Sequence, residues 1–176
     1  MLLDAGDIFQ GTPFFNFYGG ELEFKLMSML KYDAATIGNH DFDNGIGGLY
    51  SQLPNAKFDI ISANYDFKNT VLNTHIKPYK VFIKDGIKIG VFGLGVELKG
   101  LVDPRMFKET EYLNPVEIAQ DMEAPHNVAW TNSQNRGAMT LNSYVFFRSK
   151  AETKIPNTND SYRLGASEML GIFHCT

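Results

Sequence analysis

Two short stretches decide the fold of this chain: LDAGD at residues 3–7 and IGNHDFD at residues 37–43. Each follows or completes an apolar run and adds glycine together with side chains that carry oxygen or imidazole groups. In α/β proteins with parallel strands, such groups gather at the carboxyl ends of the strands. The two stretches therefore predict two neighbouring strands whose ends contribute to one functional site.

The residues around these stretches predict a strand, a helix and a second strand. We expect strands over 1–5 and 33–37, and between them an aromatic-rich loop over 7–20 followed by a helix over 21–31. A strand, helix and strand in this order form a βαβ unit with parallel strands. On the helix, apolar side chains at i, i+4, i+7 and i+8 predict the face that packs on the sheet. These side chains are Leu22, Leu26, Met29 and Leu30.

Elements of both kinds are expected beyond residue 43. The pair Asp85-Gly86 lies between two runs rich in β-forming residues, which predicts a β-hairpin. Asn114 followed by Pro115 has the pattern of a helix N-cap and a first-turn proline. The expected elements are a helix over 45–53, a strand over 58–63, hairpin strands over 79–84 and 87–94, a helix from Asn114 to Asp121, and a strand-like run over 141–147.

These elements predict an α/β fold with a layered mixed β-sheet and flanking helices, incomplete at both ends. The composition changes after about residue 122, where Asn, Ser, Thr and Gln become frequent. We therefore expect a partial catalytic domain over 1–121 and a divergent or frame-disrupted segment over 122–176. Unpaired sheet edges in such a fragment favour self-association.

Composition excludes several classes of function. The chain has 176 residues and a net charge of −4, with no basic stripe of the kind that binds nucleic-acid polymers. No apolar run approaches the ~20 residues that span a membrane. A single cysteine, Cys175, excludes an intrachain disulfide. The expected partner is a small molecule.

Four side chains in the two stretches have the chemistry of a hydrolytic metal site. A carboxylate such as Asp7 can bridge two divalent cations held ~3.5–4 Å apart. Asn39 offers a neutral oxygen ligand. His40 can donate a hydrogen bond to a phosphoryl oxygen or to the leaving group, and Asp43, three residues on, can orient the imidazole. A calcium loop starting at Asp41 is rejected, because its third ligand position is a glycine and no glutamate closes it.

The two stretches resemble ligand blocks of the calcineurin-like metallophosphoesterases. Together with residues 88–94 and 112–120, they are similar to the 5′-nucleotidase branch. The resemblance implies hydrolysis of nucleoside 5′-phosphates to nucleoside and phosphate with two divalent metal ions, Mn²⁺ or Zn²⁺. It assigns Asp7 as the bridging ligand, Asn39 as a ligand of one metal, and His40 with Asp43 as a dyad acting on the transition state. It also implies a periplasmic, cell-surface or extracellular location.

Several blocks of that family are absent from this sequence. No Asp-x-His block precedes residue 1, and the remaining histidines, His75, His126 and His174, do not lie in the family's later histidine blocks. We therefore expect an internal fragment of the catalytic domain that is weak or inactive by itself. The alternative is a non-catalytic remnant that folds and at most binds a divalent cation weakly.

Overall fold

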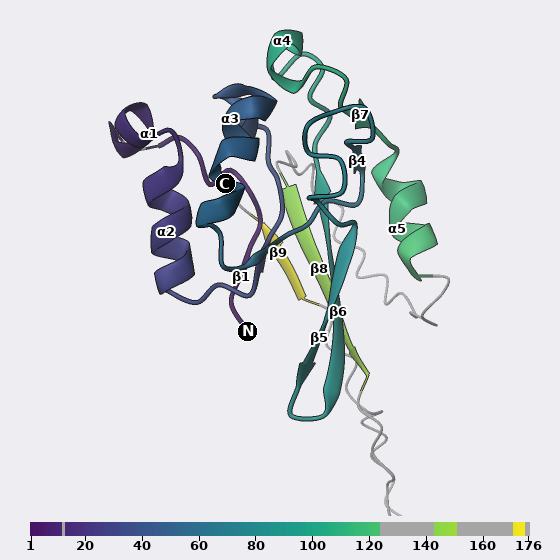
Figure 1. The fold of residues 1–176 in the computed structure, drawn as a ribbon. Coiled ribbons are helices and arrows are strands. Elements are labelled where there is room, and N and C mark those ends of the chain that lie inside the picture. Colours follow the sequence, from purple (N-terminus) through teal and green to yellow (C-terminus); the bar gives the residue numbers. More distant parts are fainter. Residues whose placement is uncertain (12, 124–142, 151–170, 175–176) are drawn as a thin grey trace, which may run out of the picture.

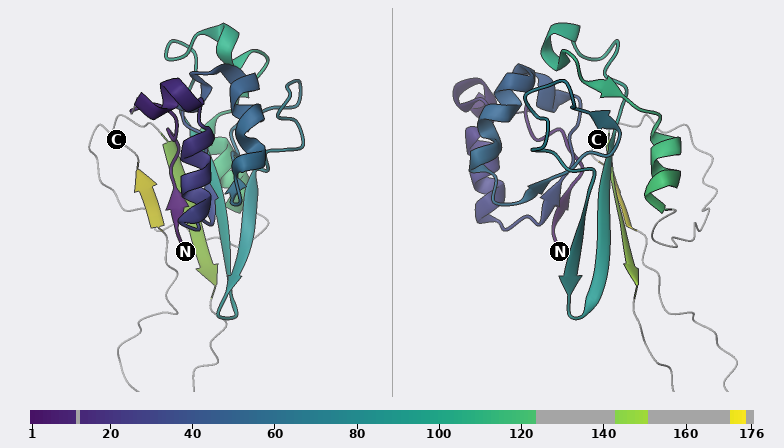
Figure 2. Two further views of the ribbon diagram at one scale, coloured as in Figure 1. Left: turned by 60° about the vertical axis from the view of Figure 1, so that its left-hand side comes forward. Right: turned by 45° about the vertical axis from the view of Figure 1, so that its right-hand side comes forward.

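Four layers build the part of the chain that the computed structural model describes, which is residues 1–11, 13–123, 143–150 and 171–174. Helices α1 (Pro13–Tyr18), α2 (Glu21–Met29) and α3 (Gly45–Gln52) cover one face of a three-stranded sheet (Figure 1). A four-stranded sheet packs on the other face, and α5 (Pro115–Glu123) lies on its outer side (Figure 2). The predicted α/β class with layered sheets and flanking helices is confirmed.

The first sheet is parallel and contains β1 (Leu3–Asp4), β2 (Ala34–Ala35) and β3 (Asp59–Ile60), in that order. Leu3 pairs with Ala34, and Ala35 pairs with Ile60. The βαβ unit is therefore confirmed, although its strands are shorter than the sequence predicts. Because β1 and β2 are parallel neighbours, the loops that follow them emerge at the same edge of the sheet.

The second sheet is antiparallel, with strand order β5-β6-β8-β9. Its strands are β5 (Tyr79–Lys84), β6 (Ile87–Gly95), β8 (Ser143–Lys150) and β9 (Gly171–His174). The predicted hairpin is confirmed, and both turn residues have the positive φ that a tight hairpin turn requires, 51° at Asp85 and 79° at Gly86. A two-stranded ladder joins β4 (Tyr65–Asp66) to β7 (Glu111–Tyr112), and the short helix α4 (Pro104–Phe107) precedes β7.

Parallel and antiparallel strands thus lie in separate sheets instead of one mixed sheet. The reason is the alternation of apolar residues along the hairpin. Phe82, Ile89 and Val91 lie on one face of β5 and β6 and pack against Ala34 and Ile61 of the parallel sheet. A hairpin with an apolar face buries it by packing face to face, which pairing at the sheet edge cannot do.

Helix α2 buries the face opposite to the one that its apolar spacing predicts. The ring of Phe24 is 1% exposed and packs between Phe9 and Phe58, with ring centroids 5.4 and 5.6 Å away. One large aromatic ring fills this space, so the predicted packing face is wrong. Three of its four residues are exposed: Leu26 (47%), Met29 (76%) and Leu30 (67%). The expected loop over 7–20 also contains helix α1.

Asn114 caps α5, because its Oδ1 accepts a hydrogen bond from the backbone of Val116 at 3.0 Å. The helix predicted over 45–53 and the strand-like run over 141–147 correspond to α3 and β8. Most of the segment after residue 122 lies outside the described residues, so the division of the chain after residue 121 stays a prediction. No helix in the described ranges is long and apolar enough to cross a membrane.

Candidate functional site

The loops after β1 and β2 approach each other so closely that both require glycine. A Cβ atom on Gly6 would lie 2.6 Å from the backbone nitrogen of Gly38, and one on Gly38 would lie 2.6 Å from the backbone nitrogen of Asp7. Gly6 also has a φ of 94°, which side chains rarely adopt. The two sequence stretches that decide the fold are therefore packed against each other.

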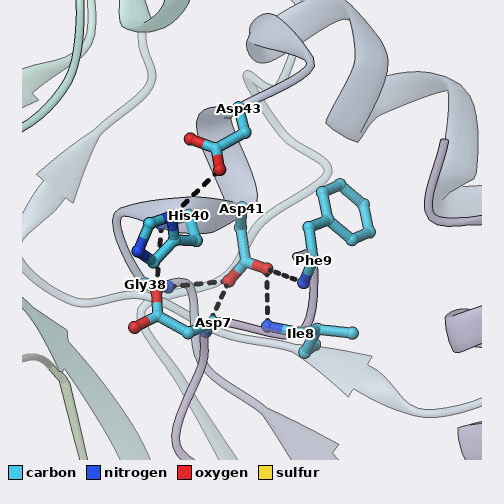
Figure 3. A network of polar contacts seen from close by, with 7 residues as sticks. All are labelled: Asp7, Ile8, Phe9, Gly38, His40, Asp41 and Asp43. Carbon is cyan, nitrogen blue, oxygen red and sulfur yellow. Dashed lines mark hydrogen bonds and ion pairs between the residues drawn. The ribbon is translucent and has the colours of Figure 1, made fainter. Parts of the chain in front are cut away.

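Asp7 lies at the contact between these loops. Its φ is 59°, an uncommon left-handed conformation for a residue with a side chain. Oδ1 accepts a hydrogen bond from the backbone nitrogen of His40 at 2.9 Å (Figure 3). Oδ2 accepts no hydrogen bond from the described part of the chain. The carboxylate is half-buried, and one of its oxygens is available for a ligand.

Asn39 and His40 begin a short 3₁₀ turn, η1 (His40–Phe42). The backbone carbonyl of Asn39 accepts a hydrogen bond from Phe42 at 3.2 Å, whereas its half-buried carboxamide has no partner within the described ranges. Because the carboxylate of Asp7 binds the backbone of the next residue, His40, the structure brings the Asp7 side chain beside the turn that carries Asn39.

His40 and Asp43 form an ion pair across this turn. Nδ1 of the imidazole lies 2.9 Å from Oδ2 of Asp43. The hydrogen bond from Asp43 raises the pKa of His40 above its ordinary value against the opposing effect of burial, and the nearby carboxylates of Asp7 and Asp41 add to the increase. The imidazole is partly exposed, so Nε2 is the nitrogen left to meet a ligand.

Asp41 is a member of the site that the sequence did not reveal. Its side chain is 1% exposed, and its two oxygens accept four backbone hydrogen bonds. The donors are Asp7 (3.1 Å), Ile8 (2.8 Å), Phe9 (3.1 Å) and Gly38 (2.8 Å). The pKa of Asp41 is raised to about 7, because the effect of burial outweighs the hydrogen bonds from Gly38 and Phe9, which lower it. All four contacts are N–H donors, which is the arrangement that suits an ionised carboxylate.

A further carboxylate, Asp4, lies at the end of β1. Its Oδ1 accepts a hydrogen bond from the backbone of Gly6 at 2.9 Å. Burial raises the pKa of Asp4, and the negative charge of Asp7 raises it further. Asp4, Asp7 and Asp41 therefore concentrate negative charge at one edge of the parallel sheet, where a cation would relieve their repulsion.

The oxygens of Asp7 and Asn39 fit part of the ligand set of a divalent cation. One is anionic and the other neutral, and hard cations such as Mn²⁺ prefer such oxygen ligands. In the residues that the structure describes, no group of three or more His, Cys, Asp or Glu side chains is arranged to hold a metal ion. Asp7 and Asn39 would therefore supply only part of a coordination shell.

Among the other histidines, only His75 has a described side chain, and it lies outside this site. His75 is exposed, and its ring contacts Tyr50 of α3 with centroids 5.1 Å apart. His126 lies outside the described residues, and only the backbone of His174, at the end of β9, is described.

Comparison with known proteins gives a consistent result. The family model described as "Calcineurin-like phosphoesterase" matches residues 1–149. A snake venom 5′-nucleotidase from Crotalus adamanteus is 44% identical over 97 residues, which are 53% of this chain and 16% of that protein. A 5′-nucleotidase from Vibrio parahaemolyticus is 38% identical over 125 residues, which are 70% of this chain and 22% of that protein.

Solved structures show the same likeness. The crystal structure of a 5′-nucleotidase precursor from Thermus thermophilus aligns with a TM-score of 0.63 at 35% identity, covering 70% of this chain and 24% of that one. This chain therefore spans about a fifth of the length of the curated relatives that it matches.

Proposed function

The chain belongs to the calcineurin-like phosphoesterase family, and we propose from that membership that it is part of a metal-dependent phosphoesterase of the 5′-nucleotidase type. The reaction is the hydrolysis of nucleoside 5′-phosphates to nucleoside and phosphate. Its relatives are named as 5′-nucleotidases, which are hydrolases. The observation that carries the proposal is the hydrogen bond from the backbone of His40 to Asp7, because it joins the two loops that bear the candidate ligands.

In this proposal Asp7 and Asn39 hold the metal ions. Asp7 would be the ligand shared by the two divalent cations, and Asn39 would be a ligand of one of them. Bound divalent ions of this kind activate water and withdraw charge from a phosphoryl group. Mn²⁺ or Zn²⁺ is the proposed metal. Asp4 and Asp41 lie near enough to Asp7 for its negative charge to raise their pKa values, and a bound cation would relieve this repulsion.

His40 acts on the phosphate in the same proposal. Asp43 holds Nδ1, so the imidazole presents Nε2 and donates a hydrogen bond to a phosphoryl oxygen or to the leaving group. Proton transfer by a positioned side chain typically contributes ~10²–10⁴-fold to a rate. The exposure of His40 gives a small-molecule substrate direct access to this nitrogen.

We propose that this chain alone has weak activity, because two ligands cannot hold two metal ions tightly. A non-catalytic domain that binds one cation weakly is the alternative, and the lack of a cluster of three ligands among the described residues favours it. For the whole protein we propose a nucleotide substrate and an exported location, by analogy with relatives such as the one named as a snake venom enzyme.

Phosphate release from AMP in the presence of Mn²⁺ tests the proposal. We expect slow turnover that Asn39→Ala or His40→Ala abolishes. The matched control is His75→Ala, which removes an exposed imidazole that contacts Tyr50 and is expected to leave turnover unchanged. Absence of turnover in the parent chain would favour the alternative. Fast turnover lost in Asn39→Ala would show that the fragment is more active than proposed.

A further inference from the structure

The carboxylate of Asp41 is the point at which the loops after β1 and β2 are joined. Its Oδ1 accepts from Ile8 and Phe9 in the first loop, and its Oδ2 accepts from Asp7 in the first loop and Gly38 in the second. Figure 3 shows these bonds converging on the single side chain. The donors in the first loop lie 32 to 34 residues from Asp41 along the chain.

We propose that Asp41 is a positioning residue, which fixes the ligand oxygens of Asp7 and Asn39 relative to each other without touching the metal. This inference rests on the proposed function, since it takes those two residues as ligands. Asp41 holds the backbone nitrogen of Asp7 itself and, in the other loop, that of Gly38, the residue directly before Asn39. The carboxylate of Asp41 therefore binds the backbone of one candidate ligand, Asp7, and of the residue next to the other, Asn39.

The conformation of Asp7 shows why such support is needed. A φ of 59° costs energy for a residue with a side chain and persists only where the surroundings impose it. Asp7 donates its backbone N–H to Asp41 at 3.1 Å and accepts at its own Oδ1 from His40, the neighbour of Asp41, at 2.9 Å. These two bonds fix both the backbone and the side chain of Asp7.

A carboxylate is the side chain that fits four N–H donors. Each of its oxygens carries two lone pairs, so all four donors are satisfied at once. An amide of the same shape has one oxygen and one NH₂ group, and the NH₂ group would face two N–H donors that it cannot bind. The Asp41→Asn variant therefore keeps the volume of the buried side chain but breaks the link on one side.

Binding of Mn²⁺ alone, measured by electron paramagnetic resonance, separates positioning from a general effect on stability. Residues that orient metal ligands typically change metal affinity by ~10–100-fold when substituted. We expect Asp41→Asn to weaken Mn²⁺ binding by at least about tenfold, at a temperature where circular dichroism shows the variant to be folded.

Asn64→Asp is the matched control. Asn64 is fully buried and forms two hydrogen bonds of 2.8 Å with the backbone of Gly95, away from both loops. Its substitution is also isosteric and also breaks a buried backbone link. We expect Mn²⁺ affinity in the folded Asn64→Asp protein to stay within about twofold of the parent, a change well under the 1.4 kcal/mol that corresponds to tenfold. Equal weakening by both variants, or none by Asp41→Asn, would overturn the proposal.

Amide hydrogen exchange without metal gives a second and independent readout. In Asp41→Asn we expect faster exchange at the donor pair that faces the NH₂ group, either Ile8 and Phe9 or Asp7 and Gly38, than in the strands of the parallel sheet. Uniform acceleration would mean that Asp41 only stabilises the fold and would overturn the inference. If the parent chain binds no Mn²⁺, the proposed function fails, while this exchange pattern still decides whether Asp41 positions the loops.

If Asp41→Asn does not fold, Asp41→Glu replaces it in the Mn²⁺ binding experiment. It retains the charge and both oxygens, but its longer side chain displaces the two loops relative to each other. A positioning role predicts weaker Mn²⁺ binding in the folded Asp41→Glu protein. An affinity equal to that of the parent would overturn it.

Discussion

Oδ1 of Asp7 lies 2.9 Å from the backbone nitrogen of His40, and directly beside this bond Gly38 leaves no room for a side chain. A methyl group at Gly38 would collide with the carboxylate and backbone of Asp7. The contact between the two loops therefore requires glycine at position 38, because a Cβ atom there would collide with Asp7.

We predict that Gly38→Ala destabilises the protein by ~1–3 kcal/mol, the usual cost of overpacking, and displaces the carboxylate of Asp7. Gly47→Ala is the control, because nothing lies within 4 Å of a Cβ at this position inside α3. There the change removes a helix-disfavouring glycine and is expected to stabilise by up to ~1 kcal/mol. Urea unfolding of the three proteins measures both effects. A Gly38→Ala protein as stable as its parent would contradict the close approach of the loops.

The burial of α2 gives a second prediction. Phe24→Ala is expected to cost ~3–5 kcal/mol, because it empties a site between two aromatic rings. Met29→Ala, on the face that the apolar spacing favours, is expected to change stability by less than ~0.5 kcal/mol, because Met29 is 76% exposed. Thermal unfolding compares the two variants. If Met29→Ala lowered stability more than Phe24→Ala, the packing face predicted from the apolar spacing would be correct.

These two cases show which parts of the fold the sequence determines locally. The hairpin at Asp85-Gly86 follows from a turn that only a few residue pairs can form, so it is predictable from neighbours alone. The packing face of α2 depends on Phe9 and Phe58, which come from other parts of the chain. Separation of the two sheets likewise depends on which faces meet in space.

The same distinction applies to the candidate site. His40 and Asp43 are three residues apart, and one turn suffices to bring them together. The partners of Asp41 in the first loop lie 32 to 34 residues away, and its position in the stretch does not tell whether it points outward to a cation or inward to the backbone. Asp41 and Phe42 are consecutive and both buried in this turn, a pattern that no simple alternation of apolar and polar residues reveals.

The link between the hairpin and the parallel sheet should depend on pH. Burial raises the pKa of Asp33, but hydrogen bonds from Lys84 (2.8 Å) and from the backbone of Leu2 (2.8 Å) outweigh it, so the pKa is lowered overall. A carboxyl group whose pKa is lower in the folded state stabilises the fold above its unfolded pKa of ~3.9. That stabilisation is lost as the pH falls through the folded pKa.

We therefore predict that Lys84→Met lowers stability by ~0.2–1 kcal/mol near pH 7 and by less near pH 3. Lys99→Met is the control, because Lys99 is exposed and its side chain has no partner in the described part of the chain. Thermal unfolding across this pH range measures the difference. A Lys84→Met effect that grows on acidification would contradict the role of Asp33.

Self-association is predicted to involve β5, an end strand of the four-stranded sheet as described. Val81 and Ile83 are two residues apart on one face of this strand and are 44% and 69% exposed. A strand with apolar side chains and an open edge pairs readily with a second copy. We expect Ile83→Lys to lower the associated fraction in sedimentation velocity experiments over a concentration series. Val116→Lys, at a residue of α5 that is 64% exposed, is the control and should leave association unchanged. If Ile83→Lys and Val116→Lys lowered the associated fraction equally, the effect would come from the added charge, and β5 would be excluded as the site of contact.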